Sequence, residues 1–391
     1  MDDRFIKNHV DECKGDRMMK MADNMMITRD DTKIMKGIAI ILMLTHHLWS
    51  FPDRMAGGSL NYSFSIFGMS SIVYFGLFGK ICVSLFFLGG YGIYKSSQGK
   101  SYDIIRKLKK LYLEYWKVFL IFIPIAFVFF SHQTAYCDNA TIWNRFGQFT
   151  WTEFINNFLG MSTSFNGEWW FLEAYVFAVI TFPLIRKVFD KHSAAVNIAL
   201  VIAGEIIFAN VCPAIGGIQE LGNLNTNVLY QRFILSGVPY ISCFWMGIAA
   251  AKDNLLIRIR QSMEKEHLLN PFIDILIWGA VIFLRGDCLG QSFDFVYIPF
   301  LIISSLDIVY RTSFVRKGLL CLGRQSTNMW LIHSFLCYYF YPAVLVITCT
   351  RWAIPSLLLL IVFSYLLSLC VDYFWKGIRF VSNQIILVLK H

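Results

Sequence analysis

Long apolar runs separated by short charged segments dominate the sequence. Because most runs are long enough to cross the roughly 30 Å hydrocarbon core of a bilayer, we predict ten membrane-spanning helices. Only Arg285 and Asp287 supply a polar break near 271–310, so a re-entrant pair is the alternative there. The pattern predicts an all-α, polytopic helical membrane protein with helices near 34–51, 72–95, 111–131, 169–185, 195–212, 232–251, 271–285, 292–310, 325–348 and 353–374.

The cationic residues indicate how these helices are oriented. Most of the 35 Lys and Arg lie in alternate segments between predicted helices: 1–36, 95–110, 186–191, 252–265, 311–324 and 376–390. Cytoplasmic segments of membrane proteins carry such an excess of positive charge. We therefore predict that the N and C termini are cytoplasmic, with tails 1–33 and 379–391 flanking a single transmembrane domain, 34–378.

Composition excludes several other classes. The chain is 56% hydrophobic and only 16% charged, outside the usual range of soluble domains. The net charge of +9 does not indicate a nucleic-acid partner, because the Lys and Arg lie between apolar runs. No Cys/His cluster has metal-ligand spacing, so no metal is predicted. A disulfide among Cys137, Cys212 and Cys288, in predicted outer segments, is an open alternative.

The first predicted helix holds a cation and two histidines in an apolar run, at Lys36, His46 and His47. Eleven residues make almost three helical turns, so Lys36 and His47 share a face about 16 Å apart along the axis. Adjacent residues point about 100° apart, so His46 does not share that face. Ionisable side chains in membrane helices usually line polar cavities. We predict acid–base or acyl-transfer chemistry at His47, with His46 a weaker candidate and packing hydrogen bonds the alternative.

A second segment combines small residues with cations. Gly89, Gly90 and Gly92 would let another helix or a ligand approach the backbone. The basic run that follows includes Arg106, Lys107 and Lys110, at the cytoplasmic entrance of the third helix. These cations could bind the phosphates of a nucleotide-bearing cofactor. On charge alone, topology and contact with anionic lipid headgroups are the favoured explanation.

Two further motifs bring ionisable residues into the bilayer. Glu173 lies several residues into a predicted helix and needs a cation, a histidine or a wet cavity as partner. Glu168 lies at the interface, where a solvated role is expected. His333 lies about two turns into the helix that begins near Arg324 and Ser326, where it is either a site residue or a structural hydrogen-bonding group.

The predicted outer loop 132–168 is rich in aromatic and amide side chains, among them Trp143, Trp151 and Asn156. Loops often carry recognition, and flat aromatic rings beside amides suit a sugar. An aromatic belt at the membrane interface is the alternative.

Together these motifs resemble the membrane acyltransferase-3 family. That family begins its first helix with a basic residue, ten intervening residues and a histidine, matched by Lys36 and His47. A Phe-Phe-x-x-Gly-Tyr stretch follows, matched by residues 86–91, and then a basic helix start, matched by 106–110. A Trp-Phe-Leu segment is matched by residues 170–172.

The last shared motif is Gly-x-x-Ser followed by Leu-x-His, matched by Gly323, Ser326, Leu331 and His333. The resemblance covers residues 30–375 in order. Departures are Gly90 in place of a frequent Ser and Lys36 in place of the more usual Arg, whose bidentate fork a lysine lacks.

The resemblance implies an O-acyltransferase that moves an acyl group, usually from acetyl-CoA on the cytoplasmic side, to a sugar hydroxyl of a surface or exopolysaccharide outside. It implies His47 as general base or acyl carrier, oriented by Glu173 or His333, and Arg106, Lys107 and Lys110 as the site of the CoA phosphates. It also implies a bacterial plasma membrane and a glycan acceptor, with polysaccharide biosynthesis or export machinery as a partner.

The alternative function is a transporter or flippase for a glycolipid or metabolite, with the histidines as a proton relay. No internal repeat is evident and no pair of broken helices occupies corresponding halves of the chain, and both features disfavour transport.

Overall fold

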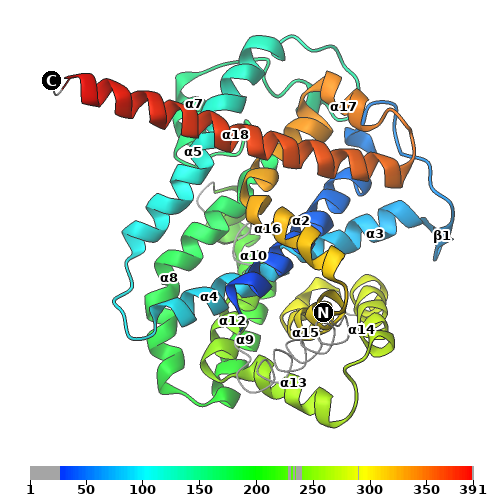
Figure 1. Ribbon diagram of the computed structural model, residues 1–391, viewed down its shortest axis with the longest axis vertical. Helices are drawn as coiled ribbons and strands as arrows, with labels where there is room; N and C mark the ends of the chain where they lie inside the picture. The colour runs from blue at the N-terminus through cyan, green and yellow to red at the C-terminus, as the bar shows by residue number, and fades with distance from the viewer. Residues whose placement is uncertain (1–26, 228–229, 232–233, 235–239, 289, 390–391) are drawn as a thin grey trace, which may run out of the picture.

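The computed structural model describes residues 27–389, apart from 228–229, 232–233, 235–239 and 289. Regular structure in this part of the chain is almost entirely helical (Figure 1), as predicted. The exception is a small antiparallel hairpin of β1 (Ser65–Ile66) and β2 (Met69–Ser70), in which Ser65 pairs with Ser70. Most of the predicted tail 1–33 and the beginning of the predicted helix 232–251 lie outside the described residues.

Helices occupy the predicted apolar segments. The α-helices are α2 (Arg29–Trp49), α3 (Ser71–Gly79), α4 (Phe87–Ser97), α5 (Ile104–Phe129), α6 (Ala140–Trp143), α7 (Trp151–Phe158), α8 (Phe171–Lys191), α9 (Ala194–Ile206), α10 (Cys212–Gly216), α12 (Ile241–Lys252), α13 (Leu255–Lys265), α14 (Pro271–Phe283), α15 (Asp294–Arg311), α16 (Ser313–Ser334), α17 (Tyr341–Ile347) and α18 (Ala353–Leu389).

Short helical turns extend or connect these helices. The 3₁₀ turns are η1 (Pro52–Arg54), η2 (Lys80–Cys82), η3 (Ser84–Phe86), η4 (Gly167–Trp170), η6 (Gln219–Leu221), η7 (Leu224–Thr226) and η11 (Gln291–Phe293). The π turns are η5 (Ile207–Val211), η10 (Leu284–Cys288) and η12 (Phe335–Tyr339).

Among the described residues, five helical stretches are long and apolar enough to cross a membrane: Ser71–Ser97, Ile104–Phe129, Ala194–Gly216, Gln291–Arg311 and Ala353–Ile385. A sixth results if Ser313–Tyr339 and Tyr341–Ile347, bent by 94° at their junction, form one span. The protein is therefore embedded in a membrane by several apolar helices. Ten crossings with both ends in the cytoplasm stay a prediction.

Helix α2 lies at the centre of the fold and packs mainly against α16 and α3 (Figure 1). Its first turn is closed by a capping box, in which Thr28 and Asp31 exchange side-chain and backbone hydrogen bonds. Ile34, near the start of α2, belongs to one buried apolar cluster, whereas Leu44 and Leu48 belong to a second. Because α2 bridges both clusters, its polar residues are held in a fixed frame.

Two glycines bring the backbones of α2 and α16 into contact. A Cβ added at Gly37 would lie 2.4 Å from the carbonyl oxygen of Leu319. A Cβ added at Gly323 would lie only 1.8 Å from the carbonyl oxygen of Lys33. Any larger side chain at these positions would force the two helices apart, so the glycines fix how α16 lies along α2.

A similar contact joins α4 and α12. A Cβ at Gly90 would lie 1.9 Å from the Phe244 carbonyl oxygen, and one at Gly247 would lie 2.0 Å from that of Phe87. The close helix approach predicted for the small residues of α4 is thus present at Gly90, whereas the space around Gly92 is open.

The polar break near residue 285 contains a buried ion pair. Arg285 Nε lies 2.8 Å from Asp294 Oδ1, and the two side chains are only 7% and 1% exposed. Ser84 donates a hydrogen bond to the same carboxylate, 2.5 Å from Oδ2.

The three cysteines considered for an outer disulfide, Cys137, Cys212 and Cys288, are all free.

Candidate active site

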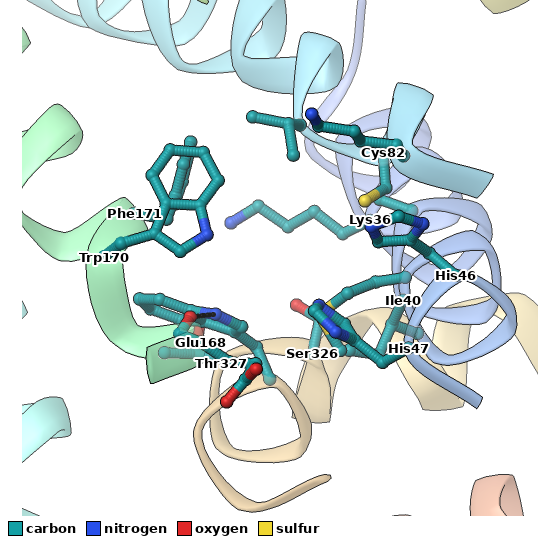
Figure 2. Close-up of a pocket in the computed structure, with 15 residues that line it drawn as sticks. Lys36, Ile40, His46, His47, Cys82, Glu168, Trp170, Phe171, Ser326 and Thr327 are labelled. Carbon is teal, nitrogen blue, oxygen red and sulfur yellow. Dashed lines mark hydrogen bonds between the residues drawn. The ribbon is translucent and has the colours of Figure 1, made fainter. Parts of the chain in front are cut away.

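Two cavities meet beside His47. The first, the Lys36 cavity, has a volume of about 240 Å³ and extends from His47 along α2 to Lys36 and across to Ser326 and Thr327 of α16 (Figure 2). The second, the Arg54 cavity, has a volume of about 510 Å³ and extends toward Arg54, Thr141 and Arg145 in the segments beyond the end of α2. The residues that line both cavities are His46, His47, Lys80, Glu168 and Trp170.

Lys36 and His47 line one wall of the Lys36 cavity, as their helical spacing predicted. Figure 2 shows the Lys36 side chain extended across the cavity toward Trp170, with His47 further along the same helix. His46, which helical spacing places on a different face of α2 from His47, lines the cavity as well. The cavity spans more of the circumference of α2 than the 100° between adjacent residues.

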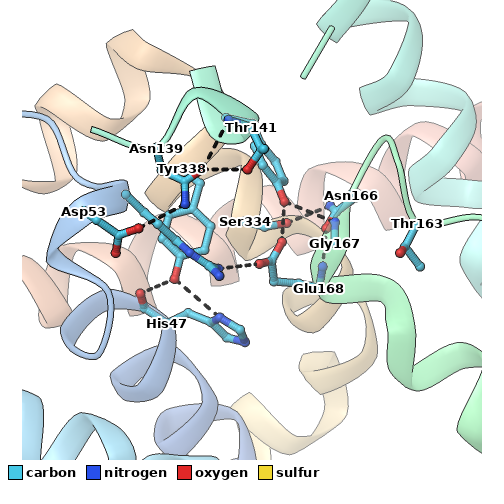
Figure 3. A network of polar contacts seen from close by, with 12 residues as sticks. His47, Asp53, Asn139, Thr141, Thr163, Asn166, Gly167, Glu168, Ser334 and Tyr338 are labelled. Carbon is cyan, nitrogen blue, oxygen red and sulfur yellow. Dashed lines mark hydrogen bonds and ion pairs between the residues drawn. The ribbon is translucent and has the colours of Figure 1, made fainter. Parts of the chain in front are cut away.

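The hydrogen bonds of His47 determine which of its ring nitrogens is free. The Tyr338 hydroxyl donates to the backbone carbonyl of His47, and its oxygen lies 3.4 Å from His47 Nδ1 (Figure 3). Because the hydroxyl proton is committed to the carbonyl, the oxygen can only accept from Nδ1–H. This arrangement favours the tautomer in which Nε2 carries a lone pair, as a general base requires.

His333 lies directly beside His47. Their ring centroids are 4.8 Å apart, and the His333 side chain is fully buried. His333 Nδ1 donates to the Trp330 carbonyl oxygen at 2.6 Å, and its Nε2 has no hydrogen-bond partner among the described residues. His333 lines neither cavity, so it can support or orient His47 but does not itself face the cavity space.

His46 is fixed by the end of α2 and the neighbouring helix. Its Nδ1 lies 2.9 Å from the carbonyl oxygen of Gly76 and 3.0 Å from the Ser50 hydroxyl. A carbonyl oxygen only accepts, so Nδ1 carries the proton. These contacts attach the end of α2 to α3, and they give His46 a structural role beside its place in the cavity wall.

Glu168 is the carboxylate that lies between the two cavities. Its Oε1 is 3.1 Å from Arg54 Nη1, and Tyr339 donates to its Oε2. Arg54 in turn stacks over Phe51, with its Cζ 4.0 Å from the ring centroid. Burial alone would lower the pKa of the Arg54 guanidinium, but the negative charge of Glu168 beside it raises that pKa above its ordinary value.

The segment that carries Glu168 is attached to α16. Asn166 donates to the Ser334 hydroxyl at 2.7 Å, and the Trp330 indole donates to the Glu168 carbonyl oxygen at 3.2 Å. The π turn η12 immediately follows Ser334 and presents Tyr338 to His47 and Tyr339 to Glu168. π turns are often found at functional sites, and here one positions both hydroxyls.

Other residues predicted for the site lie elsewhere. Glu173 is buried in α8 and lines neither cavity. It lies close enough to Tyr112 and Tyr115 of α5 to act on them electrostatically. Its predicted role in orienting His47 stays a prediction, while Glu168, expected to be solvated, is the buried carboxylate of the cavities.

The predicted phosphate-binding cations form a group at the start of α5. Arg106 and Lys110 are exposed and Lys107 is half-buried, and none of the three lines the Lys36 cavity. Lys110 is close enough to Lys36 for electrostatic repulsion between them. The group therefore lies on the same side of the molecule as the Lys36 end of α2.

Sequence reasoning missed Arg54, Arg145, Tyr338 and Tyr339. Nothing in the sequence distinguishes the two tyrosines, because an aromatic residue in an apolar run is usually part of the core. The two arginines could have been recognised from the sequence. They belong to the small group of cations outside the predicted cytoplasmic segments, where a positive charge needs a local explanation.

The chain matches a known family over most of its length. The acyltransferase domain model of the acyltransferase-3 family matches residues 31–373. No curated protein and no solved structure matches the chain. The family match includes α2 with Lys36 and His47, the Glu168 segment and α16 with His333. The chain therefore belongs to the acyltransferase-3 family and is a membrane acyltransferase.

Proposed function

We propose that this membrane acyltransferase transfers an acyl group, acetyl in the simplest case, from acyl-CoA in the Lys36 cavity to a sugar hydroxyl in the Arg54 cavity. The observation that carries the proposal is the junction of the two cavities at His47. A donor and an acceptor entering from opposite ends can meet only there. The acceptor is a glycan at the outer side of a bacterial plasma membrane, and both chain termini are cytoplasmic.

His47 acts as the general base in this scheme. Its Nε2 takes the proton of the acceptor hydroxyl as the oxygen attacks the thioester carbonyl. The C–O bond forms, the C–S bond breaks, and the imidazolium returns its proton to the departing thiolate. The products are an acyl ester and free CoA. Tyr338 holds the ring in the tautomer that this step requires, as its contacts with Nδ1 and the backbone carbonyl support.

Two neighbouring groups support the charge that develops on His47. His333 lies 4.8 Å from it between ring centroids, and its imidazole positions the His47 ring. The Glu168 carboxylate is the buried negative charge at the junction and stabilises the imidazolium. We assign to Glu168 the orienting role that the family resemblance implied for Glu173.

On the donor side, Lys36 and the Arg106, Lys107 and Lys110 group supply positive charge. A CoA molecule carries phosphates on its nucleotide end and its thioester on a long, thin arm. The exposed group at the start of α5 suits the phosphates, and the Lys36 cavity suits the arm, because its walls are mostly apolar side chains such as Ala39, Ile40 and Met43.

The test is the O-acetyl content of cell-surface glycans in a host that expresses the chain or its His47→Gln variant at equal membrane abundance. We expect alkali-labile acetyl groups with the wild type and a loss of 10²-fold or more with the variant, the usual contribution of a general base. Equal acetylation by both would reject His47. If neither adds acetyl, radiolabelled acetyl-CoA offered to membrane vesicles shows whether any acyl transfer occurs.

A further inference from the structure

The Arg54 cavity contains more positive than negative charge. Arg54, Lys80 and Arg145 contribute their cationic side chains to its lining, whereas Glu168 is the one carboxylate among its described lining residues. The other polar lining residues, such as Thr141, are neutral at physiological pH or are histidines. Arg54 uses Glu168 as its partner at 3.1 Å. The carboxylate thus already has a cationic partner, and two cations remain.

Neither Lys80 nor Arg145 forms an ion pair with a described carboxylate. Arg145 instead donates Nη1 to the backbone carbonyls of Thr163 and Ser164, at 3.1 and 2.7 Å, and stacks over Tyr339. These contacts fix the guanidinium but do not compensate its charge. Its Nε is buried and has no hydrogen-bond partner within the described chain.

Arg54, although paired with Glu168, shares one feature with Arg145. Its Nε is also buried without a partner in the described residues. Asp53, which acts on Arg54 electrostatically, is exposed, accepts a hydrogen bond from Asn139 and does not line the cavity. Burying a charged or polar group without a partner is costly, so the cavity is complementary to a ligand that brings negative charge.

We propose that the acceptor of this enzyme is an anionic glycan, and that Arg145 with Lys80 binds its oxyanion while the reacting hydroxyl lies at His47. This inference rests on the proposed function and narrows its acceptor class. The oxyanion is a sugar carboxylate or a phosphate, both of which match the planar fork of a guanidinium. The volume of about 510 Å³ lies within the range of pockets that hold small ligands.

The binding test measures the chemical modification of the Arg145 side chain and requires no catalytic turnover. The full chain, purified in lipid nanodiscs, is treated with phenylglyoxal, and modification of each arginine is followed by peptide mass spectrometry. The probes are methyl glucuronide, glycerol phosphate and, as the neutral match, methyl glucoside. Arg351 is the matched control, because it also donates to backbone carbonyls, those of Ala56, Gly57 and Ser59, but lies outside both cavities.

We expect an anionic probe at about ten times its Kd to slow the modification of Arg145 by about tenfold and to leave Arg351 unchanged. Protection by the glucuronide alone identifies a carboxylate, and protection by glycerol phosphate alone identifies a phosphate. Protection by both supports a general oxyanion site. No protection by either, or equal protection by methyl glucoside, overturns the proposal.

A transfer experiment tests the same site during catalysis. Acyl transfer is compared for an acidic oligosaccharide and its carboxyl-reduced, neutral form, with the wild type, Arg145→Gln and Arg145→Lys. We expect Arg145→Gln to raise KM for the acidic acceptor by about 10- to 100-fold, to leave the neutral acceptor unchanged, and Arg145→Lys to restore part of the loss. A wild type that uses both acceptors equally well overturns the proposal.

The two hypotheses fail in distinguishable ways. Hydrolysis of acyl-CoA that depends on His47 is measured in the same nanodiscs without any acceptor, and its absence would count against the proposed function. Protection of Arg145 by an anion does not require that reaction. An enzyme that turns over acyl-CoA but shows no anion protection would retain its function and lose only the anionic acceptor.

Discussion

Replacement of Glu168 by Gln tests which carboxylate orients His47. The structure favours Glu168, whereas the sequence favoured Glu173. Glu168 bonds Arg54 at 3.1 Å and Tyr339, whereas Glu173 lines neither cavity. Gln keeps the size of the side chain and one acceptor oxygen. It removes the negative charge, and its amide places a donor where Tyr339 now donates.

The magnitude follows from the burial of the pair. Removing one partner of a fully buried ion pair costs about 3–5 kcal/mol. Glu168 is 7% exposed but Arg54 is 25% exposed, so water compensates part of the loss. We expect a cost of about 2 kcal/mol in the free energy of unfolding. Because the imidazolium also loses a nearby negative charge in the transition state, we expect kcat for acyl transfer to fall by about tenfold or more.

The assay is acyl transfer from radiolabelled acetyl-CoA in membrane vesicles, normalised to folded protein by fluorescence-detected size exclusion. Glu173→Gln is the matched variant, because it makes the same chemical change in a buried glutamate outside both cavities. We expect it to retain kcat within about threefold, the change that a ΔΔG of about 0.6 kcal/mol produces. A large loss in Glu173→Gln together with normal turnover in Glu168→Gln would refute the reasoning and restore the sequence-based assignment.

Three further outcomes are expected. His47→Gln should lower acyl transfer by at least 10²-fold at unchanged thermal stability. His46→Gln should mainly lower the melting temperature, because a contact between two helices is lost. Equal effects of the two variants on kcat would contradict this division. Gly323→Ala should destabilise the fold by about 1–3 kcal/mol through its clash with α2, with Gly318→Ala, which meets no atom within 4 Å, as the control in a thermal melt. Asp294→Asn should destabilise by about 3–5 kcal/mol because it leaves its arginine partner buried and unpaired, and an unchanged melting temperature would show that the pair is not coupled to folding.

The helical fold was predictable because the lipid environment forces apolar residues into long runs. The relation between Lys36 and His47 was predictable for a similar reason, since both lie on one continuous helix and its period fixes their faces. Nothing in those runs indicates which helices pack together. The neighbourhood of His47 and His333, 286 positions apart along the chain by their numbers, depends on glycine contacts between α2 and α16.

The choice between Glu168 and Glu173 could not be made from the sequence. Sequence position favoured Glu173, because it lies deeper in an apolar run. The structure starts α8 at Phe171 and places Glu168 in the preceding 3₁₀ turn, which folds back onto α16 through Trp330. Tertiary contact, rather than depth along the helix, thus decides which carboxylate is beside the histidines.

The backbone contact of α2 with α16 has a consequence for how substrates enter. His47 and His333 lie on two helices that touch at Gly37 and Gly323, so they move as one body. Opening the path to the Lys36 cavity therefore depends on the wall opposite α2, formed in part by Trp170 and Phe171 (Figure 2). Mutations in that wall should therefore change the rates at which substrates enter and products leave. They should leave the activation barrier of the chemical step unchanged, because that barrier depends on His47 and His333.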